Sequence, residues 1–378
     1  MKQDRKEKGN VPNLRFPGFE GEWKWHKLGD IANISKGFGI SKDQISEKGQ
    51  SCILYGELYT KYKSEVIQTI LSRTDINFPN LVKSKANDVI IPSSGETAID
   101  IATARCVPFS DVLLGGDLNI IRLENDNGVF LSYQLNGVRK HDIAKIAQGI
   151  SVVHLYGEGL KKLKIAICSN EEQKKIASFL YLIDERISTQ NKIIEQYKSL
   201  IKGITHHILK GGKANVKLKE CVACNSSFLT EGEFEGRNGE YPVFGATGII
   251  ASTSEYKITE NSILIIKDGA SIGRVQYATG KYSVIGTLNY LTANNDFSLK
   301  YIYYLLRYFN FDKYRVGSGI PHIYFKDYGN ELIYCPSIEE QNKIAKTLSV
   351  MEAKFNIEQI MLKVHTMQKS YLLQNLFI

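Results

Sequence analysis

Two short polar segments are the clearest candidates for chemistry in this sequence. Ser93-Ser94-Gly95-Glu96-Thr97 and Lys267-Asp268-Gly269-Ala270-Ser271 each follow a short apolar run that predicts a buried strand. A loop at the end of such a strand can direct side chains and backbone amides towards phosphates or base edges. An ordinary polar turn has the same composition, so the pattern leaves both interpretations open.

A third candidate is the aromatic and glycine-rich loop at residues 241–248, Tyr-Pro-Val-Phe-Gly-Ala-Thr-Gly. It matches residues 53–59, and the basic residues Lys61 and Lys63 lie just beyond that match. Glycines of this kind also serve tight turns. The loop therefore predicts either a binding surface or a turn.

His154 and His322 form a fourth pattern, because they recur at equivalent positions in two related halves of the chain. Each is followed two residues later by a tyrosine, Tyr156 or Tyr324. Recurrence in a duplicated chain favours a packing or hinge role over catalysis. We therefore interpret both histidines as structural.

The spacing of Cys221 and Cys224 is that of a metal-binding pair, but no second pair completes a tetrahedral site. Alignment of the two halves places these cysteines on Ile31 and Ile34, which are apolar core positions. The sequence therefore predicts reduced thiols in the protein interior and no metal site.

Motifs for catalysis are missing from the sequence. There is no G-x-x-x-x-G-K-[S/T] phosphate-binding loop, no Gly-x-Ser-x-Gly elbow and no His-Glu-x-x-His helix. The Asn-Pro-Pro-Tyr or Asp-Pro-Pro-Tyr run that amino-methyltransferases use on a flipped base is also missing. We therefore predict no catalytic residue.

Composition sets the class of protein. The 378 residues carry a formal net charge of +8 (48 Lys+Arg against 40 Asp+Glu), and 43% are hydrophobic. This suits two or more domains with sizeable cores, and the charge permits nucleic acid as a partner without requiring it. No apolar run is long enough to predict a membrane span. Residues 1–8 are polar and contain no apolar signal core, so we expect a cytoplasmic protein.

Residues 169–212 predict one very long helix around which the chain is organised. Ser169 and Glu172 have the spacing of a capping box. Mainly apolar residues then recur in alternating four- and three-residue steps, which Gln190 and Tyr197 complete. Gly211-Gly212 is expected to end the helix. At 1.5 Å per residue, such a helix is roughly 60 Å long.

The same helix returns at residues 337–378, where Glu339 corresponds to Glu171 with a shift of 168 (339 − 171). Two such helices can cover their apolar stripes by pairing with each other, or another protein can cover part of a stripe. Polar residues, among them Lys369, occupy later seam positions of the second helix. The expected seam comprises Ile176, Leu180, Ile183, Ile187, Ile194 and Ile201 in the first helix and Ile344, Leu348, Met351 and Phe355 in the second.

The segments that precede the two helices also match each other, which indicates a tandem duplication. For example, Asn87-Asp88-Val89-Ile90-Ile91 corresponds to Asn261-Ser262-Ile263-Leu264-Ile265. We therefore predict an α+β protein with two tandem mixed α/β domains and two long helices in an antiparallel coiled coil, with pseudo-twofold symmetry. The expected boundaries are 1–25 for an N-terminal tail and extended segment, 26–168 and 213–336 for the globular domains, and 169–212 and 337–378 for the helices.

The whole chain resembles one family, the specificity subunits of type I restriction–modification enzymes. The resemblance rests on Asn10-Val11-Pro12-Asn13-Leu14-Arg15-Phe16-Pro17-Gly18-Phe19, on Lys-Leu-Gly-Asp at 27–30 and on Tyr-Pro-Val-Phe-Gly at 241–245. Its most specific part is Glu-Glu-Gln-x-Lys-Ile-Ala at 171–177 and 339–345.

This resemblance implies that each globular domain is a target recognition domain that reads one half of a bipartite, asymmetric DNA sequence. It implies that the coiled coil sets the half-site spacing and docks two modification (methyltransferase) subunits, which bind S-adenosylmethionine. Restriction (motor–nuclease) subunits, which use ATP and Mg²⁺, join for cleavage. The chain itself would be a non-catalytic subunit of a restriction endonuclease/adenine methyltransferase complex, without a cofactor of its own.

If each domain reads double-stranded DNA, its basic side chains meet phosphates and its other polar side chains reach base edges, mainly in the major groove. Recognition domains of the family vary greatly, so our candidates come from the loops themselves. They are Lys61, Ser94, Glu96, Thr97 and Arg105 in the first domain and Thr247, Lys267, Asp268, Ser271 and Arg274 in the second. The alternatives are a bivalent protein-interaction scaffold without DNA specificity and a stand-alone enzyme such as a fused restriction–modification protein.

Overall fold

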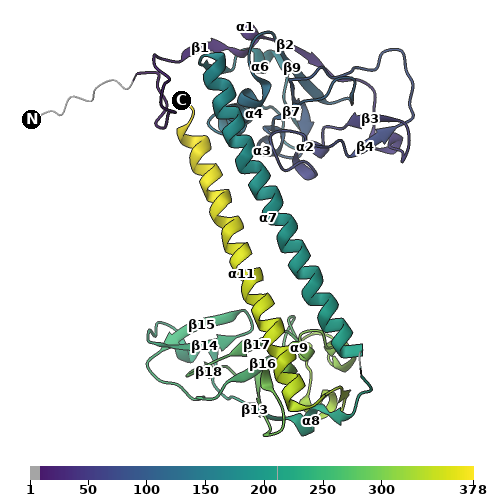
Figure 1. Cartoon of the computed structure of the whole chain (residues 1–378), viewed down its shortest axis with the longest axis vertical. Helices are drawn as coiled ribbons and strands as arrows, with labels where there is room; N and C mark the ends of the chain where they lie inside the picture. The colour runs from purple at the N-terminus through teal and green to yellow at the C-terminus, as the bar shows by residue number, and fades with distance from the viewer. Residues whose placement is uncertain (1–8, 211) are drawn as a thin grey trace, which may run out of the picture. The chain divides into compact units, whose positions relative to one another are not determined.

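The computed structural model describes residues 9–210 and 212–378, and it describes only the backbone of residues 209 and 210. Our expectations for residues 1–8 and for Gly211 therefore lie outside the described residues. The chain forms two compact units: unit 1 comprises residues up to Asn191 together with Ile360–Ile378, and unit 2 comprises Lys192–Gln359. Each long helix contributes residues to both units (Figure 1).

Unit 1 is built on a four-stranded antiparallel sheet. Its strands are β2 (Ala32–Lys36), β9 (Leu118–Leu123), β5 (Asp88–Pro92) and β7 (Arg105–Val107), in that spatial order. All residues of β5 are buried, which explains the apolar run at residues 89–92. Helix α4 (Gly128–Asn136) packs on β5 and β7.

A second sheet of unit 1 has the order β4 (Ser72–Thr74), β3 (Gln50–Ile53) and β8 (Leu113–Leu114), with β3 and β8 parallel. Two smaller sheets pair β1 (Lys24–Lys27) with β11 (Lys164–Ile167) and β6 (Ser94–Gly95) with β10 (Val153–His154). The short helices are α1 (Leu28–Ile31), η1 (Lys42–Gln44), α2 (Glu57–Thr60), α3 (Ala98–Ile101), α5 (Lys140–Ile146) and α6 (Gly157–Lys161).

Unit 2 repeats this architecture. Its four-stranded sheet has the order β13 (Val222–Ser226), β19 (Leu288–Ala293), β16 (Ser262–Ile266) and β17 (Val275–Ala278). Its three-stranded sheet has the order β15 (Gly248–Thr253), β14 (Tyr241–Gly245) and β18 (Ser283–Val284), and β12 (Val216–Lys217) pairs with β20 (Leu332–Ile333). The short helices are α8 (Leu218–Cys221), η2 (Glu231–Phe234), α9 (Leu299–Leu306), η3 (Phe311–Tyr314) and α10 (Phe325–Tyr328).

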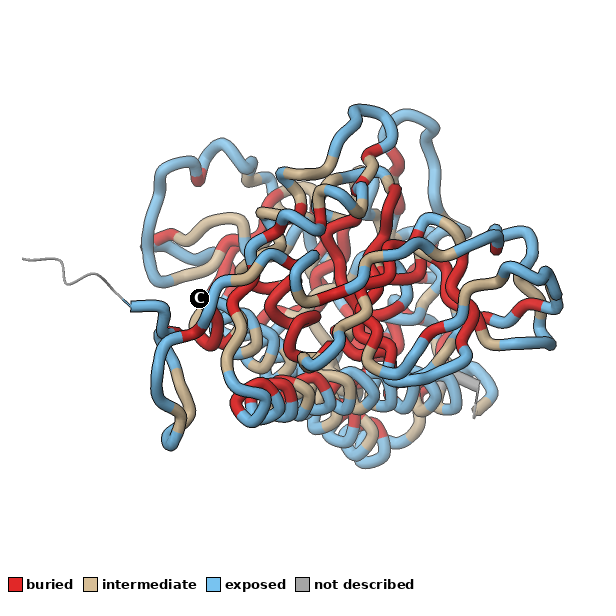
Figure 2. The backbone as a smooth tube through the Cα atoms, turned by 90° about the horizontal axis from the view of Figure 1, so that it is seen from above, coloured by how far each residue is buried: buried red, intermediate tan, exposed pale blue. Residues whose placement is uncertain are grey.

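The matching strand order confirms the predicted tandem α+β domains. In both three-stranded sheets the middle strand has one antiparallel neighbour and one parallel neighbour. Exposed residues lie mainly in the connecting loops and on the outer faces of the long helices (Figure 2). Loops are thus the part of each unit that is free to differ on a common scaffold.

The long helices α7 (Asn170–Lys210) and α11 (Ile338–Asn375) begin in the same way. The hydroxyl of Ser169 accepts a hydrogen bond from the Glu172 N–H at 3.3 Å, and Ser337 accepts one from the Glu340 N–H at 3.3 Å. The reciprocal half of the capping box does not form at Glu172. Its carboxylate instead accepts two hydrogen bonds of 2.8 Å from the guanidinium of Arg15, which ties the N-terminal segment to α7.

Gln173 and Gln341 explain the repeated glutamine of the Glu-Glu-Gln sequence. The side chain of Gln173 accepts a hydrogen bond from the backbone N–H of Asn127 at 2.9 Å, and Gln341 accepts one from Ser298 at 2.9 Å. Both glutamines are buried, and their partners are the N-cap residues of α4 and α9. Each glutamine therefore fastens the start of a long helix to a shorter helix of the same unit.

Within each unit, α7 packs against α11. In unit 1 the beginning of α7 shares a core with the end of α11, and in unit 2 the end of α7 shares a core with the beginning of α11. The two helices therefore run antiparallel. The seam residues, all buried or half-buried, are Ile176, Leu180, Ile183, Ile187, Ile194, Ile201, Ile344, Leu348, Met351 and Phe355. No helix in the described part of the chain has the length and apolar content needed to cross a membrane.

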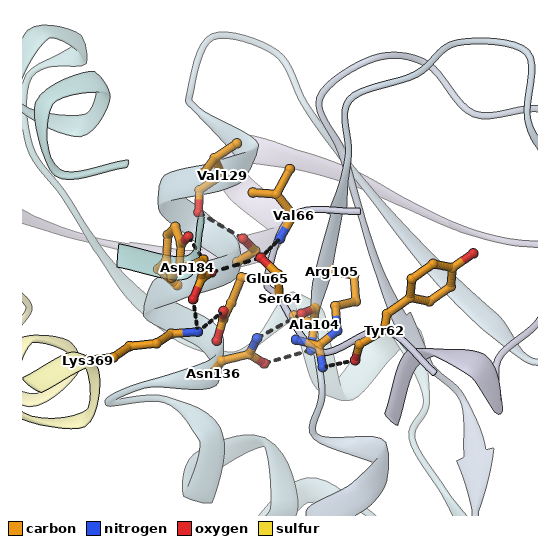
Figure 3. A network of polar contacts seen from close by, with 12 residues as sticks. Tyr62, Ser64, Glu65, Val66, Ala104, Arg105, Val129, Asn136, Asp184 and Lys369 are labelled. Atoms are coloured by element: carbon orange, nitrogen blue, oxygen red, sulfur yellow. Dashed lines mark hydrogen bonds and ion pairs between the residues drawn. The ribbon is translucent and has the colours of Figure 1, made fainter. Parts of the chain in front are cut away.

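A buried ion cluster in unit 1 joins α11 to α7 and to the segment between α2 and β4 (Figure 3). The ammonium of Lys369 on α11 lies 2.6 Å from Oδ1 of Asp184 on α7 and also pairs with Glu65. Oδ2 of Asp184 accepts hydrogen bonds from the hydroxyls of Ser64 and Tyr133, each at 2.8 Å. Two buried carboxylates thus account for a lysine on the seam of α11.

Candidate nucleic-acid interface

The candidate loop of unit 2, residues 267–274, connects β16 to β17. It is closed by a hydrogen bond from the Gly273 N–H to the carbonyl of Ile266 at 2.8 Å, and Gly269 adopts a φ of +97°, which favours glycine. The loop brings four of the expected DNA contacts into one segment. They are Lys267 and Asp268, which are half-buried, and Ser271 and Arg274, which are exposed.

Thr247 lies at the exposed turn between β14 and β15. This turn is joined to β17 by Gln276, whose Nε2 donates a hydrogen bond to the carbonyl of Gly245 at 3.0 Å. Arg274 immediately precedes β17. The hairpin turn and the candidate loop therefore meet at the same strand.

The equivalent loop of unit 1 connects β5 to β7 and contains α3. Thr97 caps α3, because its hydroxyl oxygen accepts a hydrogen bond from the Asp100 N–H at 3.1 Å. Thr97 and its neighbour Glu96 are exposed. Lys61, which follows α2, is also exposed and pairs with Glu57 at 2.7 Å. These three candidates of unit 1 are accessible to a ligand.

Two expected contacts, Arg105 and Ser94, are buried instead. Arg105 is 8% exposed, and its guanidinium donates hydrogen bonds to the carbonyls of Leu58 at 3.0 Å and Tyr62 at 2.9 Å. Desolvation by this burial lowers the pKa of Arg105. Ser94 is 6% exposed within β6. Because both side chains belong to the interior, neither is available to contact DNA, contrary to our expectation.

The structure adds two histidines that the sequence analysis assigned to packing. His322 forms a backbone bridge with Asp268 in unit 2, and His154 pairs with Ser94 through β10 and β6 in unit 1. Both histidines are half-buried and lie against the candidate loops. The recurrence of the two histidines is the signal in the sequence that points to them. It does not show that each histidine lies beside a candidate loop, because that contact depends on the fold.

The part of α11 in unit 1 carries a row of apolar side chains that, unlike the seam, is exposed. The row consists of Ile360 (63% exposed), Val364 (55%), Met367 (63%) and Tyr371 (58%). Its four- and three-residue steps are those of a surface that contacts another helix. The duplicated positions on α7, 168 residues earlier, are Lys192, Gln196, Ser199 and Gly203. The row is therefore a property of α11 and not of the duplicated helix in general.

A metal centre finds no support in the described residues 9–210 and 212–378, which contain no group of three or more His, Cys, Asp or Glu side chains able to hold an ion. All six cysteines are free. Cys221 is buried in the core of unit 2, and burial raises the pKa of the neighbouring Cys224 to about 11. Burial thus makes the Cys224 thiol harder to ionise, as in an apolar interior.

Comparison with known proteins identifies the architecture. The family model for the type I restriction modification DNA specificity domain matches residues 20–198 and 212–364. The chain belongs to this family. Recognition of DNA targets is the general role of type I specificity subunits, so the candidate loops lie on domains of a DNA-recognition family.

Individual relatives agree with this assignment. A Mycoplasma pneumoniae protein named "putative type I specificity subunit" is 22% identical over 355 residues, covering 85% of this chain and 87% of the relative. The crystal structure of a type I restriction–modification S subunit from M. genitalium has a TM-score of 0.71 at 20% identity and covers 97% of this chain and 99% of its own. A structure described for complex assembly and conformational transition of the type I R-M system has a TM-score of 0.55 at 16% identity, with 97% and 99% covered. The two solved structures share the fold of this type I specificity subunit.

Proposed function

We propose that this chain is the non-catalytic, DNA-reading subunit of a type I restriction–modification complex, and that each unit reads one half of a bipartite, asymmetric target. The observation that carries the proposal is the divergence of side chains on a duplicated scaffold. The exposed Glu96 in the loop after β5 corresponds to the exposed Ala270 in the loop after β16, so one unit has a carboxylate where the other has a methyl group. Similar scaffolds with different surfaces suit a target whose two halves differ in sequence.

The proposed DNA contacts divide by chemistry. Basic side chains meet phosphates and supply salt-dependent affinity, whereas the other polar side chains reach base edges in the major groove. The phosphate contacts are Lys61, Lys267 and Arg274, and the base-edge candidates are Glu96, Thr97, Thr247, Asp268 and Ser271. The exposure of most of these side chains and the net charge of +8 support this division.

The long helices are the proposed spacer. Two half-sites read from one face of a duplex lie about one helical turn apart, roughly 34 Å, so their readers need a stiff connection. Helix α7 is uninterrupted over 41 residues, and its glutamine fastening to unit 1 limits movement at its start. We propose that the pairing of α7 with α11 sets the permitted half-site spacing.

The same helices are the proposed docking site for two modification (methyltransferase) subunits. The exposed apolar row on α11 supports a partner helix at this surface. In this assembly the modification subunits bind S-adenosylmethionine and transfer the methyl group. Restriction (motor–nuclease) subunits use ATP and Mg²⁺ for translocation and cleavage.

Methylome sequencing tests this proposal directly. Cells that carry the chain with its modification subunits are expected to methylate one bipartite motif with a fixed gap. Substitutions in the loop of unit 2 are expected to alter one half-site and leave the other unchanged, and substitutions in unit 1 the converse. Simultaneous change of both half-sites by a variant of one unit would contradict the proposal.

The alternative function is a bivalent protein-interaction scaffold without DNA specificity, which the exposed row on α11 also fits. Binding of the purified complex to duplexes with and without the methylated motif separates the two. Equal affinity for both duplexes would favour the scaffold. Methyl transfer by the isolated chain would instead favour a stand-alone enzyme.

A further inference from the structure

His322 and Asp268 form a side-chain pair at the surface of unit 2. Nδ1 of His322 lies 2.7 Å from Oδ1 of Asp268, and the two side chains are 38% and 30% exposed. The imidazole of His322 therefore has a bound carboxylate partner and is still accessible to solvent. It belongs to the candidate loop, because Asp268 is the second residue after β16.

The backbone on both sides of His322 holds the imidazole in place. His322 and Val316 exchange two backbone hydrogen bonds of 2.8 and 2.9 Å, and the Gly269 N–H donates to the carbonyl of Pro321 at 2.9 Å. The ring of Tyr324 stacks beside the imidazole, with 6.5 Å between ring centroids and 16° between planes. The orientation of His322 is therefore determined before any ligand arrives.

The carboxylate determines which imidazole nitrogen is available to a ligand. Asp268 accepts the hydrogen bond from Nδ1–H, so in the neutral ring Nε2 is unprotonated and acts as an acceptor. Among the side chains that the structure describes, none is hydrogen-bonded to this Nε2. In the major groove, the complementary donors are the exocyclic amino groups at N6 of adenine and N4 of cytosine.

We propose that His322, oriented by Asp268, is a specificity-determining residue of unit 2 that accepts a hydrogen bond from the exocyclic amino group of an adenine or cytosine. This inference rests on the proposed DNA-reading function and deepens it by naming one base-reading atom. In this arrangement Asp268, named above as a base-edge candidate, is instead a positioning residue that acts on DNA through His322.

Unit 1 provides an internal comparison. His154 stacks with Tyr156, the counterpart of Tyr324, with 6.1 Å between ring centroids and 29° between planes. Its backbone exchanges hydrogen bonds with that of Gln148, as the backbone of His322 does with Val316. Its bridge partner is Ser94, which has no carboxylate and is buried. A carboxylate thus fixes the tautomer of the His322 imidazole in unit 2, whereas no carboxylate does so for His154 in unit 1. This difference is expected if the two half-sites differ at the base pair that each histidine faces.

The test uses the full chain co-expressed with its modification subunits, in the wild-type form and as His322→Ala, Asp268→Ser and the matched control Asp296→Asn. Asp268→Ser installs the residue of unit 1, and Asp296 is an exposed carboxylate of unit 2 outside the candidate loop. Methylomes identify the target, and competition binding then measures affinity for duplexes with each base pair of the motif changed. Thermal melting reports the folding of every variant.

If the inference holds, His322→Ala and Asp268→Ser lose roughly 10-fold of the discrimination at one position of one half-site, a factor equal to about 1.4 kcal/mol. The other half-site and the melting temperature remain unchanged, and Asp296→Asn behaves as wild type. At that position, replacing adenine by purine, or cytosine by 2-pyrimidinone, removes the amino group. This replacement weakens wild-type binding about 10-fold and has no further effect on His322→Ala.

Four results would overturn the inference. They are unchanged discrimination in both variants, equal loss of affinity for all duplexes, lowered melting temperature in both variants, and additive effects of the base analogue and His322→Ala. Each of these leaves the wild-type bipartite motif, and with it the proposed function, intact. Absence of any bipartite motif in the wild-type methylome would reject the proposed function itself, and the inference with it.

Discussion

The ammonium of Lys369 on α11 lies 2.6 Å from the carboxylate of Asp184 on α7, with side chains 13% and 4% exposed. The carboxylate of Glu65, whose side chain is 7% exposed, completes the buried cluster. Removing such charges from water is costly unless each is paired, so the cluster strongly disfavours any other register of α11 in unit 1. We infer that this lysine specifies how the end of α11 docks.

Replacing Lys369 by methionine is expected to destabilise unit 1 by about 3–5 kcal/mol, because it leaves two buried carboxylates without their ammonium partner. Denaturant unfolding measures the loss. Lys363→Met, an exposed lysine of the same helix, is the control and should have little effect. Restoring balance with Glu65→Gln and Asp184→Asn in the Lys369→Met background should recover part of the loss. Equal stability of Lys369→Met and Lys363→Met would contradict the role of the cluster.

The stabilisation by Lys369 should also depend on alkaline pH. Burial alone would lower the pKa of Lys369, but the nearby Glu65 and Asp184 carboxylates outweigh it and raise the pKa above the usual 10.5. A lysine with a raised folded-state pKa stabilises fully below its unfolded value and loses this effect as pH rises through the folded value. On the alkaline side of neutral pH, the difference in unfolding free energy between wild type and Lys369→Met should therefore shrink only above about pH 10.5. A difference that already vanishes between neutral pH and that value would argue against the pairing.

The two faces of the helix pair predict opposite phenotypes. Met367→Glu changes an exposed residue of the apolar row, so it should leave melting unchanged while weakening association with the modification subunits. Ile183→Asp buries an unpaired carboxylate at a seam position that is 4% exposed, so it should cost about 3 kcal/mol or more of stability. Co-purification and thermal melting of both variants decide the assignment. Unaltered partner binding by Met367→Glu would remove the row from the docking surface.

Arg274 and Arg105 should separate DNA affinity from folding. Arg274→Ala removes an exposed phosphate contact, so affinity should fall similarly for all sequences and the slope of log K against log salt should decrease by about 1. Arg105→Leu leaves the carbonyls of Leu58 and Tyr62 without donors and should lower stability by about 1–3 kcal/mol. Binding isotherms at several salt concentrations and melting curves test the pair. The assignment of Arg274 fails if the salt dependence of Arg274→Ala equals that of wild type.

An insertion tests the spacer. Two extra residues near Gln190 rotate the following part of α7 by about 200°, which removes its apolar face from the seam. We expect a changed half-site gap or loss of binding, whereas point changes in a recognition loop leave the gap unaltered. Methylome sequencing reads the gap directly. A wild-type gap in the insertion variant would show that the helices do not measure it.

Features that repeat along the chain were the most predictable ones. The two long helices follow from heptad spacing, and β5 and β16 follow from apolar runs, because local patterns carry these elements. The tandem duplication of the two globular domains follows from matches such as Asn87-Asp88-Val89 with Asn261-Ser262-Ile263. The strand order of the two units then confirms the duplication.

Single side chains were predicted less well, because their environment depends on distant segments. Arg105 has the side chain of a phosphate contact, yet the carbonyls of Leu58 in α2 and of Tyr62 just after this helix hold it inside. Lys369 interrupts the apolar spacing of the seam, and its partner Glu65 is 304 residues away in the sequence. Only the fold shows that the two side chains pair. His322 and Asp268 are 54 residues apart in the sequence, so their pairing could be recognised only from the fold.

The exposed apolar side chains of Ile360, Val364 and Met367 have a consequence for expression if the proposed modification subunits cover them. We then expect molecules of this chain made in excess of those subunits to associate with one another through the same side chains. The supply of the partner, and not that of this chain, would limit the number of complete assemblies.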